Sequence, residues 1–206
     1  MKDTTAIQVQ LVDDRVTAAI NHVAVARDRY RCTADGRQLP QTSKPELIAT
    51  MLRLLDVQPG HHVLEIGTGS GYSTALLAHL VGSHGQVISL DIDPEMVTRA
   101  SRLLALDGHT NVTVLQADGR RGHPPGAPYD RLMAWAQAPH AIPVAWTEQV
   151  RPGGIIVAPL RRRTPQVVRM RVLSSQQVSE EQQIAAGFIP LTSKPLRPWE
   201  DQSAPG

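Results

Sequence analysis

Apolar residues recur along the chain with two different spacings, which predict strands and helices in turn. Short, nearly continuous apolar runs are typical of strands that are buried on both faces of a parallel sheet. These runs occupy 62–66, 86–91, 112–115, 129–136 and 155–159. The segments between them carry helical spacing at 43–55, 72–81, 94–106 and 142–150. Strand and helix therefore alternate, which predicts an α/β fold with a doubly wound, mostly parallel sheet.

Both ends of the chain depart from this alternation. Near the N-terminus, four apolar residues with helical spacing predict a helix: Val12, Val16, Ile20 and Val23. Near the C-terminus, residues 166–173 and 182–191 have the pattern of strands, with no helix between them. Two successive strands without a crossover helix predict an antiparallel hairpin at the edge of the sheet.

The length of 206 residues suits one domain, which we expect to span residues 1–206. Within it, residues 1–44 form an N-terminal helical segment on the substrate side. Residues 45–195 form the core. The tail at 196–206 is polar and rich in proline, so we expect it to be loose.

Composition narrows the class of protein. Hydrophobic residues make up 41% of the chain and charged residues 19%, which is typical of a folded globular protein. The single cysteine, Cys32, allows no internal disulfide and favours a reducing, cytoplasmic location. No run of about 18 apolar residues is present, so we expect no transmembrane helix and no membrane partner. The histidines lack the spacing of metal ligands, so no metal site is expected.

A glycine-rich loop follows the first predicted strand and opens the next helix. It reads Glu65-Ile66-Gly67-Thr68-Gly69-Ser70-Gly71. Glycine allows sharp turns and close approach of a ligand to the backbone. The G-x-G-x-G spacing differs from the G-x-G-x-x-G of dinucleotide binders, and the G-K-[ST] ending of a phosphate-binding loop is absent.

The acid before this loop favours a cationic ligand. Glu65 would repel a pyrophosphate, whereas S-adenosylmethionine carries a sulfonium and an amino group. We therefore expect S-adenosyl-L-methionine as the cofactor. The residues expected to bind it in this loop are Glu65, Gly67, Thr68, Gly69 and Gly71.

Two further acids follow the next two predicted strands. Asp91, with Ile92 beside it, ends the second strand, where an acid can accept hydrogen bonds from ribose hydroxyls. Asp118 and Gly119 follow the third strand, placed to face an adenine ring. Each acid alone could simply cap a loop. Together with Glu65, at successive strand ends, they favour a cofactor pocket.

Five segments extend the case beyond the cofactor. They are Val63–Tyr72, Gln116–Gly119, Ala127–Arg131, Pro152–Gly154 and Phe188–Leu191. In this order they resemble the protein-L-isoaspartate O-methyltransferase family, over the stretch from Thr42 to Leu191. The resemblance implies a Rossmann-like class I methyltransferase that depends on S-adenosylmethionine. It also implies transfer of the methyl group to a carboxyl group of an L-isoaspartyl or aspartyl residue in a protein or peptide.

A Ser-x-Pro element of that family matches Ser43-Lys44-Pro45. The resemblance implies that Ser43 is a catalytic or substrate-orienting residue and that Thr42 lies beside it in the substrate site. Ser43 with Glu46 also has the pattern of a helix capping box, and both roles are compatible. A carboxylate is already ionised at neutral pH, so the reaction needs positioning more than a base.

The chain departs from the family pattern near the acceptor. The stretch from Tyr30 to Thr42 is short, and Ala134–Gln137 replaces a small Thr-Ala element. Trp135 could form the floor of a substrate pocket or pack in the core. These departures leave open a relative that methylates an aspartate in a ribosomally made peptide, where the ester can collapse to an aspartimide.

Two other possibilities remain at this point. One is a methyltransferase for RNA or a small molecule, which would use the shared glycine loop and the Arg161–Arg163 run. Such a run is also typical of a solvated loop, and an aromatic content of 3% is too low for a nucleic-acid stacking platform, so we do not expect a nucleic-acid partner. The other is a non-catalytic module that binds the cofactor or a peptide.

Overall fold

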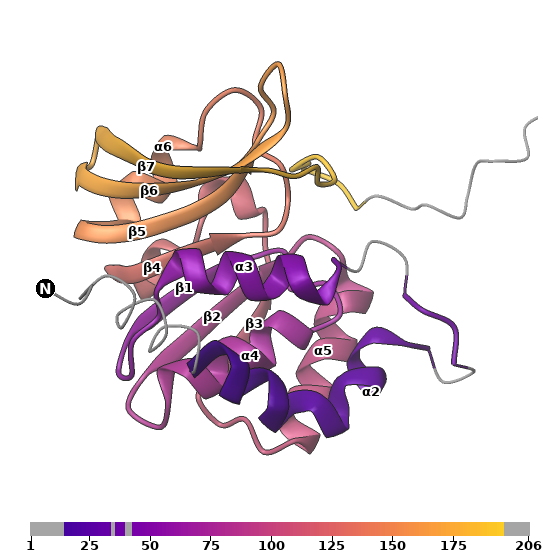
Figure 1. The fold of residues 1–206 in the computed structure, drawn as a ribbon. Helices are drawn as coiled ribbons and strands as arrows, with labels where there is room; N and C mark the ends of the chain where they lie inside the picture. Colours follow the sequence, from indigo (N-terminus) through magenta and orange to yellow (C-terminus); the bar gives the residue numbers. More distant parts are fainter. Residues whose placement is uncertain (1–14, 34–35, 40–42, 196–206) are drawn as a thin grey trace, which may run out of the picture.

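The computed structural model describes residues 15–33, 36–39 and 43–195 (Figure 1). Its strands are β1 (His62–Ile66), β2 (Gln86–Asp91), β3 (Val112–Gln116), β4 (Tyr129–Ala134), β5 (Val150–Leu160), β6 (Gln166–Ser174) and β7 (Gln177–Ala185). Its bounded α-helices are α2 (Arg27–Arg31), α3 (Pro45–Leu55), α4 (Tyr72–Val81), α5 (Pro94–Leu106) and α6 (Val144–Gln149). Short 3-10 turns are η1 (Ala24–Ala26), η2 (Gly119–Arg121) and η3 (Pro124–Gly126).

The strands form one mixed sheet in the order β3-β2-β1-β4-β5-β6-β7. β1 to β5 pair in parallel, whereas β6 runs antiparallel to β5 and β7 antiparallel to β6. The chain winds outward from β1 to β3 and then crosses back to β4, so the strand order reverses between β1 and β4. Ligands bind at such switch points, outside the carboxyl ends of the strands. The predicted doubly wound sheet with an antiparallel C-terminal hairpin is confirmed.

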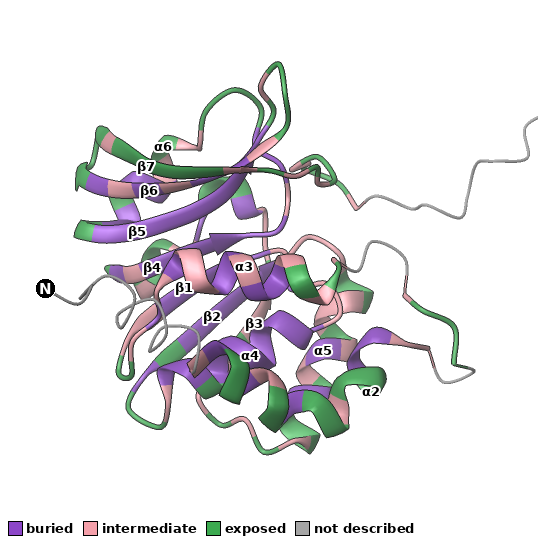
Figure 2. Cartoon of the chain, viewed as in Figure 1, coloured by how far each residue is buried: buried purple, intermediate pink, exposed green. Residues whose placement is uncertain are grey.

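The nearly continuous apolar run of β1 fills two layers of core, because successive side chains of a strand point to opposite faces. Val63 packs in the layer that contains α3, α4 and α5. Leu64 and Ile66 pack in the other layer, with Trp146 of α6. Figure 2 shows β1 and β4 buried, whereas most of β7 is exposed. This burial explains why the central strands were predictable from apolar runs.

The expected N-terminal helix is present over residues 15–23, where Val16 and Val23 are buried. Ile20 packs against the same core layer, and Val12 lies outside the described residues. The helical path then continues through η1 and α2. No helix in the described ranges is long and apolar enough to cross a membrane.

The prediction of a strand over 182–191 is wrong in its bounds. A tight connection after β6 places Gln177 opposite Ser174, so pairing starts earlier than the apolar pattern indicated. Residues after β7 leave the sheet edge, and Pro190 forms a bridge with Gln137 instead. The segment from Ile189 to Leu191 thereby crosses to the end of β4.

The bounds of other strands also differ from prediction, most of all those of β5 and β4. β5 begins at Val150, ahead of the expected Ile155, because the Pro-Gly-Gly stretch lies inside the strand, where the register against β4 shifts. Gly153 takes φ 82° there, a conformation that favours glycine. β4 ends at Ala134, which leaves Trp135 and Ala136 in the loop at the switch point.

Candidate functional site

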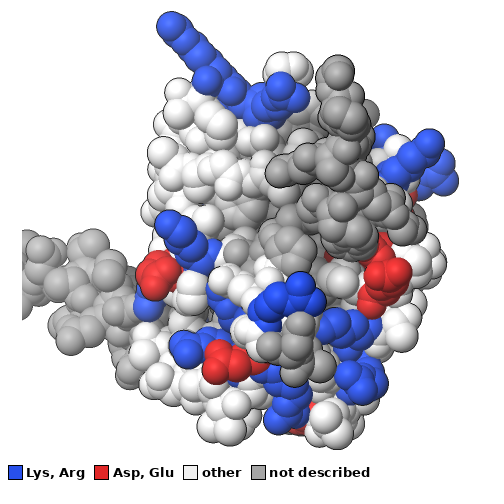
Figure 3. Space-filling view, turned by 90° about the vertical axis from the view of Figure 1, so that its right-hand side faces the viewer, with Lys and Arg blue, Asp and Glu red and all other residues white. Residues whose placement is uncertain are grey.

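A cavity of about 570 Å³ opens at the carboxyl ends of β1 and β2. Its walls come from the glycine loop after β1, the turn after β2, residues near Leu39 and Ser43, and the segment around Pro190. The last two parts lie on the right-hand side of Figure 1. Seen from that side, Lys and Arg side chains gather over the lower half of the molecule, with fewer acidic side chains among them (Figure 3).

The glycine loop takes backbone conformations that favour glycine. Gly67, Gly69 and Gly71 have φ values of 92°, 50° and 84°. Gly67 and Gly69 line the cavity. A Cβ on Gly71 would lie 3.1 Å from Cβ of Ala100 on α5, so this glycine permits close packing behind the loop. Gly71 is therefore placed to shape the loop rather than to face a ligand.

The contact expected between Glu65 and the cofactor stays a prediction, and the structure shows which protein groups surround this carboxylate. Glu65 is fully buried and does not line the cavity. Its carboxylate accepts hydrogen bonds from four side chains: Ser73 (2.6 Å), Thr74 (2.5 Å), Ser89 (2.6 Å) and Nε1 of Trp135 (2.8 Å). Burial raises the pKa of Glu65, and these four donors oppose the rise. Glu65 anchors the underside of the loop.

Thr68 has the same kind of role. It is buried, and its hydroxyl shares a hydrogen bond of 2.6 Å with the hydroxyl of Ser89 on β2. The backbone N–H groups of Gly67 and Thr68 both donate to the carbonyl of Leu90. The loop is thus fixed to β2 before any ligand binds, and Thr68 does not line the cavity.

Asp91 and Ile92 line the cavity, as expected for residues that contact the cofactor. The Asp91 carboxylate accepts hydrogen bonds from the backbone N–H of Gly69 at 2.7 Å and of Asp93 at 3.0 Å. Burial raises the pKa of Asp91, and these backbone donors oppose the rise. A carboxylate held in this way retains lone pairs for hydroxyl groups of a ligand.

After β3, the two residues predicted to face the adenine, Asp118 and Gly119, have different surroundings. Asp118 does not line the cavity, and its carboxylate pairs with the guanidinium of Arg120 at 2.6 Å. The hydrogen bond from Arg120 lowers the pKa of Asp118. Gly119 does line the cavity, and a Cβ there would overlap Cγ2 of Ile66. Gly119 therefore forms part of the cavity wall, and the contact of Asp118 with the adenine stays a prediction.

On the acceptor side, Ser43 and Trp135 line the same cavity, whereas Thr42 lies outside the described residues. The capping-box prediction is wrong. Lys44 is the residue before the first turn of α3, and no side chain caps that turn. The Ser43 hydroxyl is therefore not used as a helix cap. Trp135 is 9% exposed, so its ring both packs in the core and forms part of the cavity wall.

Sequence reasoning missed part of the cavity wall. Gln38 and Leu39 come from a small hairpin in which Cys32 pairs with Gln38. Ile189 and Pro190 come from the segment that was assigned to the last strand. The proline and the preceding glycine at 187 were the available signals that this segment leaves the sheet. The bridge between Pro190 and Gln137 is what brings this segment to the cavity, and no local sequence pattern predicted that bridge.

The residues present fit S-adenosylmethionine. Gly67, Gly69 and Gly119 present backbone without side chains at the cavity wall, Asp91 supplies a carboxylate for hydroxyl groups, and Leu90 and Ile92 supply apolar wall. Within the described ranges, no group of three or more His, Cys, Asp or Glu side chains is placed to hold a metal ion. The fold and the cavity define a class I methyltransferase that depends on S-adenosylmethionine.

Comparisons with known proteins identify the family. A model of the family described as protein-L-isoaspartate(D-aspartate) O-methyltransferase matches residues 14–196. The chain belongs to this family. It is 37% identical over 150 residues to a protein-L-isoaspartate O-methyltransferase of Ignicoccus hospitalis, which covers 72% of this chain and 71% of that protein. It is 36% identical over 192 residues to one of Methanothrix thermoacetophila, which covers 89% of this chain and 90% of that protein.

Solved structures agree with this fold. A protein-L-isoaspartate O-methyltransferase superposes with a TM-score of 0.68 at 26% identity, over 72% of this chain and 47% of that one. A Plasmodium falciparum structure described as a putative protein-L-isoaspartate O-methyltransferase in complex with S-adenosyl-L-homocysteine gives a TM-score of 0.64 at 18% identity. That match covers 74% of this chain and 76% of that one, and it supports the fold alone.

Proposed function

We propose that this protein transfers a methyl group from S-adenosylmethionine to the free carboxylate of an L-isoaspartyl or aspartyl residue in a protein or peptide. The observation that carries the proposal is that one cavity joins two sets of residues. Gly67, Gly69 and Asp91 lie on its cofactor side, and Ser43 and Trp135 on its acceptor side. The relatives named above, protein-L-isoaspartate O-methyltransferases, support this choice of acceptor.

The bound cofactor supplies a methyl group on a positively charged sulfur. The acceptor carboxylate is ionised at neutral pH, so the protein needs no general base for it. Ser43 is the residue proposed to orient it. Its hydroxyl lies just before α3, is not used as a helix cap, and can donate to a carboxylate oxygen. The positive end of the α3 dipole favours an anion at the same place.

The other acceptor-side residues are proposed to hold the reacting groups and to limit water. Leu39, Ile189 and Leu191 add apolar surface to the cavity wall, and Trp135 adds an aromatic face. Positioning of two reactants in such an enclosed site can supply much of the rate enhancement. The clustering of Lys and Arg on this face of the molecule favours an acceptor that carries negative charge (Figure 3).

A second candidate acceptor is an aspartyl residue in a dedicated precursor peptide. The observation that favours it is the compact turn at the cavity wall. Cys32 pairs with Gln38, and the N–H of Leu39 donates to the carbonyl of Arg31 at 2.8 Å. So short a connection leaves few residues to recognise isoaspartyl residues in many different proteins. The expected cytoplasmic location is a separate prediction, which cell fractionation would test.

One assay with methyl-labelled cofactor tests the proposal. It compares a peptide with isoaspartate, the same peptide with aspartate, and the same peptide with asparagine, which lacks the carboxylate. We expect a base-labile methyl ester on the isoaspartyl or the aspartyl peptide and none on the asparaginyl control. A product formed only on RNA or on a small molecule would refute the proposal. Preference for aspartate in a dedicated peptide would select the second candidate.

A further inference from the structure

Arg31, the last residue of α2, is a buried arginine without a counter-ion. Its residue surface is only 9% exposed, and its Nη1 atom is buried with no hydrogen-bond partner. Among the described residues, no acidic side chain forms an ion pair with it. Buried charges are normally paired, because removal of an unpaired charge from water is strongly unfavourable.

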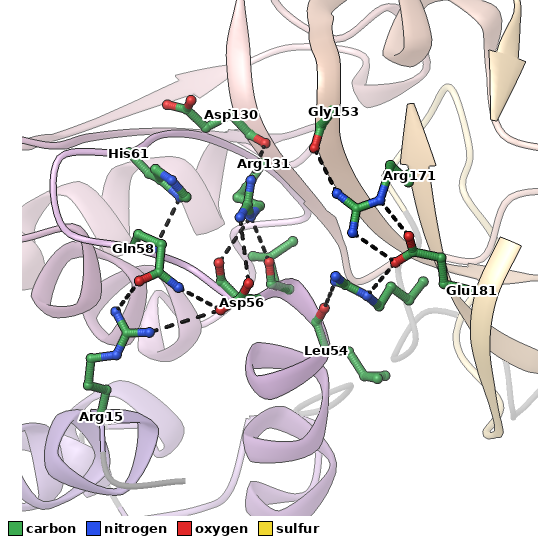
Figure 4. Close-up of polar contacts among 12 residues, drawn as sticks. Arg15, Leu54, Asp56, Gln58, His61, Asp130, Arg131, Gly153, Arg171 and Glu181 are labelled. Carbon is green, nitrogen blue, oxygen red and sulfur yellow. Dashed lines mark hydrogen bonds and ion pairs between the residues drawn. The ribbon is translucent and has the colours of Figure 1, made fainter. Parts of the chain in front are cut away.

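Arg131 on β4 shows how this protein otherwise treats a buried arginine (Figure 4). It is 8% exposed, close to the value for Arg31. Its Nε donates to the carbonyls of Leu55 at 2.8 Å and Asp56 at 3.1 Å, and its Nη1 donates to the carbonyl of Asp130 at 3.0 Å. The Asp56 carboxylate lies 3.8 Å from its Nη2. The two arginines therefore differ in that Arg131 is bonded to three carbonyls and lies beside Asp56, whereas Nη1 of Arg31 has no hydrogen-bond partner.

The Arg31 guanidinium lies against an aromatic ring. Its Cζ lies 5.7 Å from the centroid of the Tyr72 ring. A cation–π contact of this kind is weaker than the cost of burying a guanidinium, so the ring does not replace a counter-ion. The contact nevertheless fixes where the charge lies. Tyr72 is the first residue of α4, directly after the glycine loop.

This end of α4 is already favourable for an anion. Helix N-termini carry partial positive charge, and Gly71, the residue before α4, has no side chain that could cap the helix. Arg27 and Arg31 both act to lower the pKa of Tyr72, although burial raises it more. Two positive charges therefore lie near Tyr72. Arg27 is paired with the carboxylate of Asp28, at 3.5 Å. Nothing described there neutralises Arg31.

Arg31 and Tyr72 do not themselves line the cavity, but each is hydrogen-bonded through its backbone to a residue that does. The carbonyl of Arg31 accepts the N–H of Leu39, which lines the cavity. On the other side, the N–H of Tyr72 donates to Oγ of Ser70, a cavity residue of the glycine loop, at 3.3 Å. We propose that Arg31 is a binding residue for a ligand carboxylate at the start of α4. The carboxylate comes from the amino-acid part of the cofactor or from the acceptor.

Binding measurements distinguish these two sources. The first arm measures dissociation constants of S-adenosylhomocysteine and of its decarboxylated analogue, which keeps the amine. Wild-type protein should bind the carboxylate form about tenfold or more tightly than the analogue, because a charged hydrogen bond is lost in the latter. Arg31→Met should remove this preference if the cofactor supplies the carboxylate. This arm uses no acceptor and is independent of the proposed function.

The second arm rests on the proposed function and uses the isoaspartyl or aspartyl peptide. If the acceptor supplies the carboxylate, Arg31→Met keeps the preference between the two cofactor analogues. It then raises KM for the peptide about tenfold while kcat changes little. Methylation of the peptide by the wild-type protein is the control. If the wild-type protein forms no product, the proposed function fails, whereas the first arm still tests Arg31. Unchanged affinities and unchanged KM in the variant would overturn the proposal.

Thermal unfolding without ligand provides a readout that a merely structural arginine would not give. Arg31→Met should leave the melting temperature equal or raise it, because it removes an unpaired buried charge. The matched variant Arg131→Met should lower it, because three carbonyls lose their donor. A lower melting temperature of Arg31→Met, with unchanged affinity for the cofactor analogues and an unchanged KM for the peptide, would overturn the proposal. Should that variant not fold, Arg31→Lys, which keeps the charge but not the planar donor group, must weaken carboxylate binding for the proposal to stand.

Discussion

Trp135 donates its indole N–H to the carboxylate of Glu65 at 2.8 Å, deep beneath the glycine loop. The two residues lie at the ends of neighbouring parallel strands, β4 and β1. Trp135 lines the acceptor side of the cavity, whereas Glu65 supports the cofactor loop from below. One hydrogen bond thus joins the acceptor wall to the loop that holds the methyl donor.

Replacement of Trp135 by Phe should test this link. The variant keeps an aromatic ring but leaves one position of the buried Glu65 carboxylate without its donor. We expect a loss of about 1–3 kcal/mol in the free energy of unfolding, measured by urea denaturation. Cofactor affinity should fall as well, because the loop loses support. If both stability and affinity match the wild type, the bond does not support the loop.

Ser43→Ala should separate catalysis from helix capping. The structure places Lys44, not Ser43, at the start of α3, so the variant should unfold at the wild-type denaturant concentration. A capping serine would instead lose about 0.5–2 kcal/mol on this change. We expect kcat/KM for the peptide to fall about tenfold to a hundredfold, because the acceptor carboxylate is less well oriented. Cofactor affinity should stay unchanged, and a parallel fall in that affinity would contradict the assignment.

Asp91 predicts a pH dependence of cofactor binding. Burial raises its pKa above the ordinary value of 3.8, and hydroxyl groups of a ligand donate to the ionised form. Affinity for S-adenosylhomocysteine should therefore be full at neutral pH and decline as the pH falls through the raised pKa. Calorimetric titration over a pH series would measure this. Asp91→Asn should bind more weakly at neutral pH and lose the decline, and a decline that persists in the variant would assign it to another group.

Gly119→Ala should be far more damaging than a typical glycine substitution in this chain. Its Cβ would overlap Cγ2 of Ile66 at the cavity wall. We expect a loss of about 1–3 kcal/mol in the free energy of unfolding and a weaker affinity for S-adenosylhomocysteine. Gly187→Ala is the matched control, because nothing lies within 4 Å of a Cβ there. Equal effects of the two substitutions would contradict the close approach of Gly119 to β1.

The sequence predicted the central sheet closely because its strands are buried on both faces. β1 and β2 are short apolar runs that end at polar or glycine residues, and their bounds were predicted correctly. The bounds of β7 were not, because that strand is exposed and polar and its position depends on pairing with β6. Local patterns report burial well, but they do not report the register of an exposed hairpin.

A local sequence pattern was enough to predict that Gly67, Gly69 and Asp91 line a cavity, because each lies at the end of a recognisable strand. The buried hydrogen bonds of Glu65 were not predicted, because its partners Ser73 and Ser89 come from a helix and another strand, and only the fold brings them together. The missing counter-ion of Arg31 could not be seen either, since the charge of a residue shows in sequence but its burial does not.

The central claim is that one cavity holds both the methyl donor and the acceptor carboxylate. A crystal structure with S-adenosylhomocysteine and the isoaspartyl or aspartyl peptide would test it most directly. We predict the ribose hydroxyls beside the Asp91 carboxylate, the adenine beside Gly119, and the peptide carboxylate within hydrogen-bond distance of the Ser43 hydroxyl. A peptide bound outside this cavity, or a nucleoside that makes no contact with Asp91, would contradict the account.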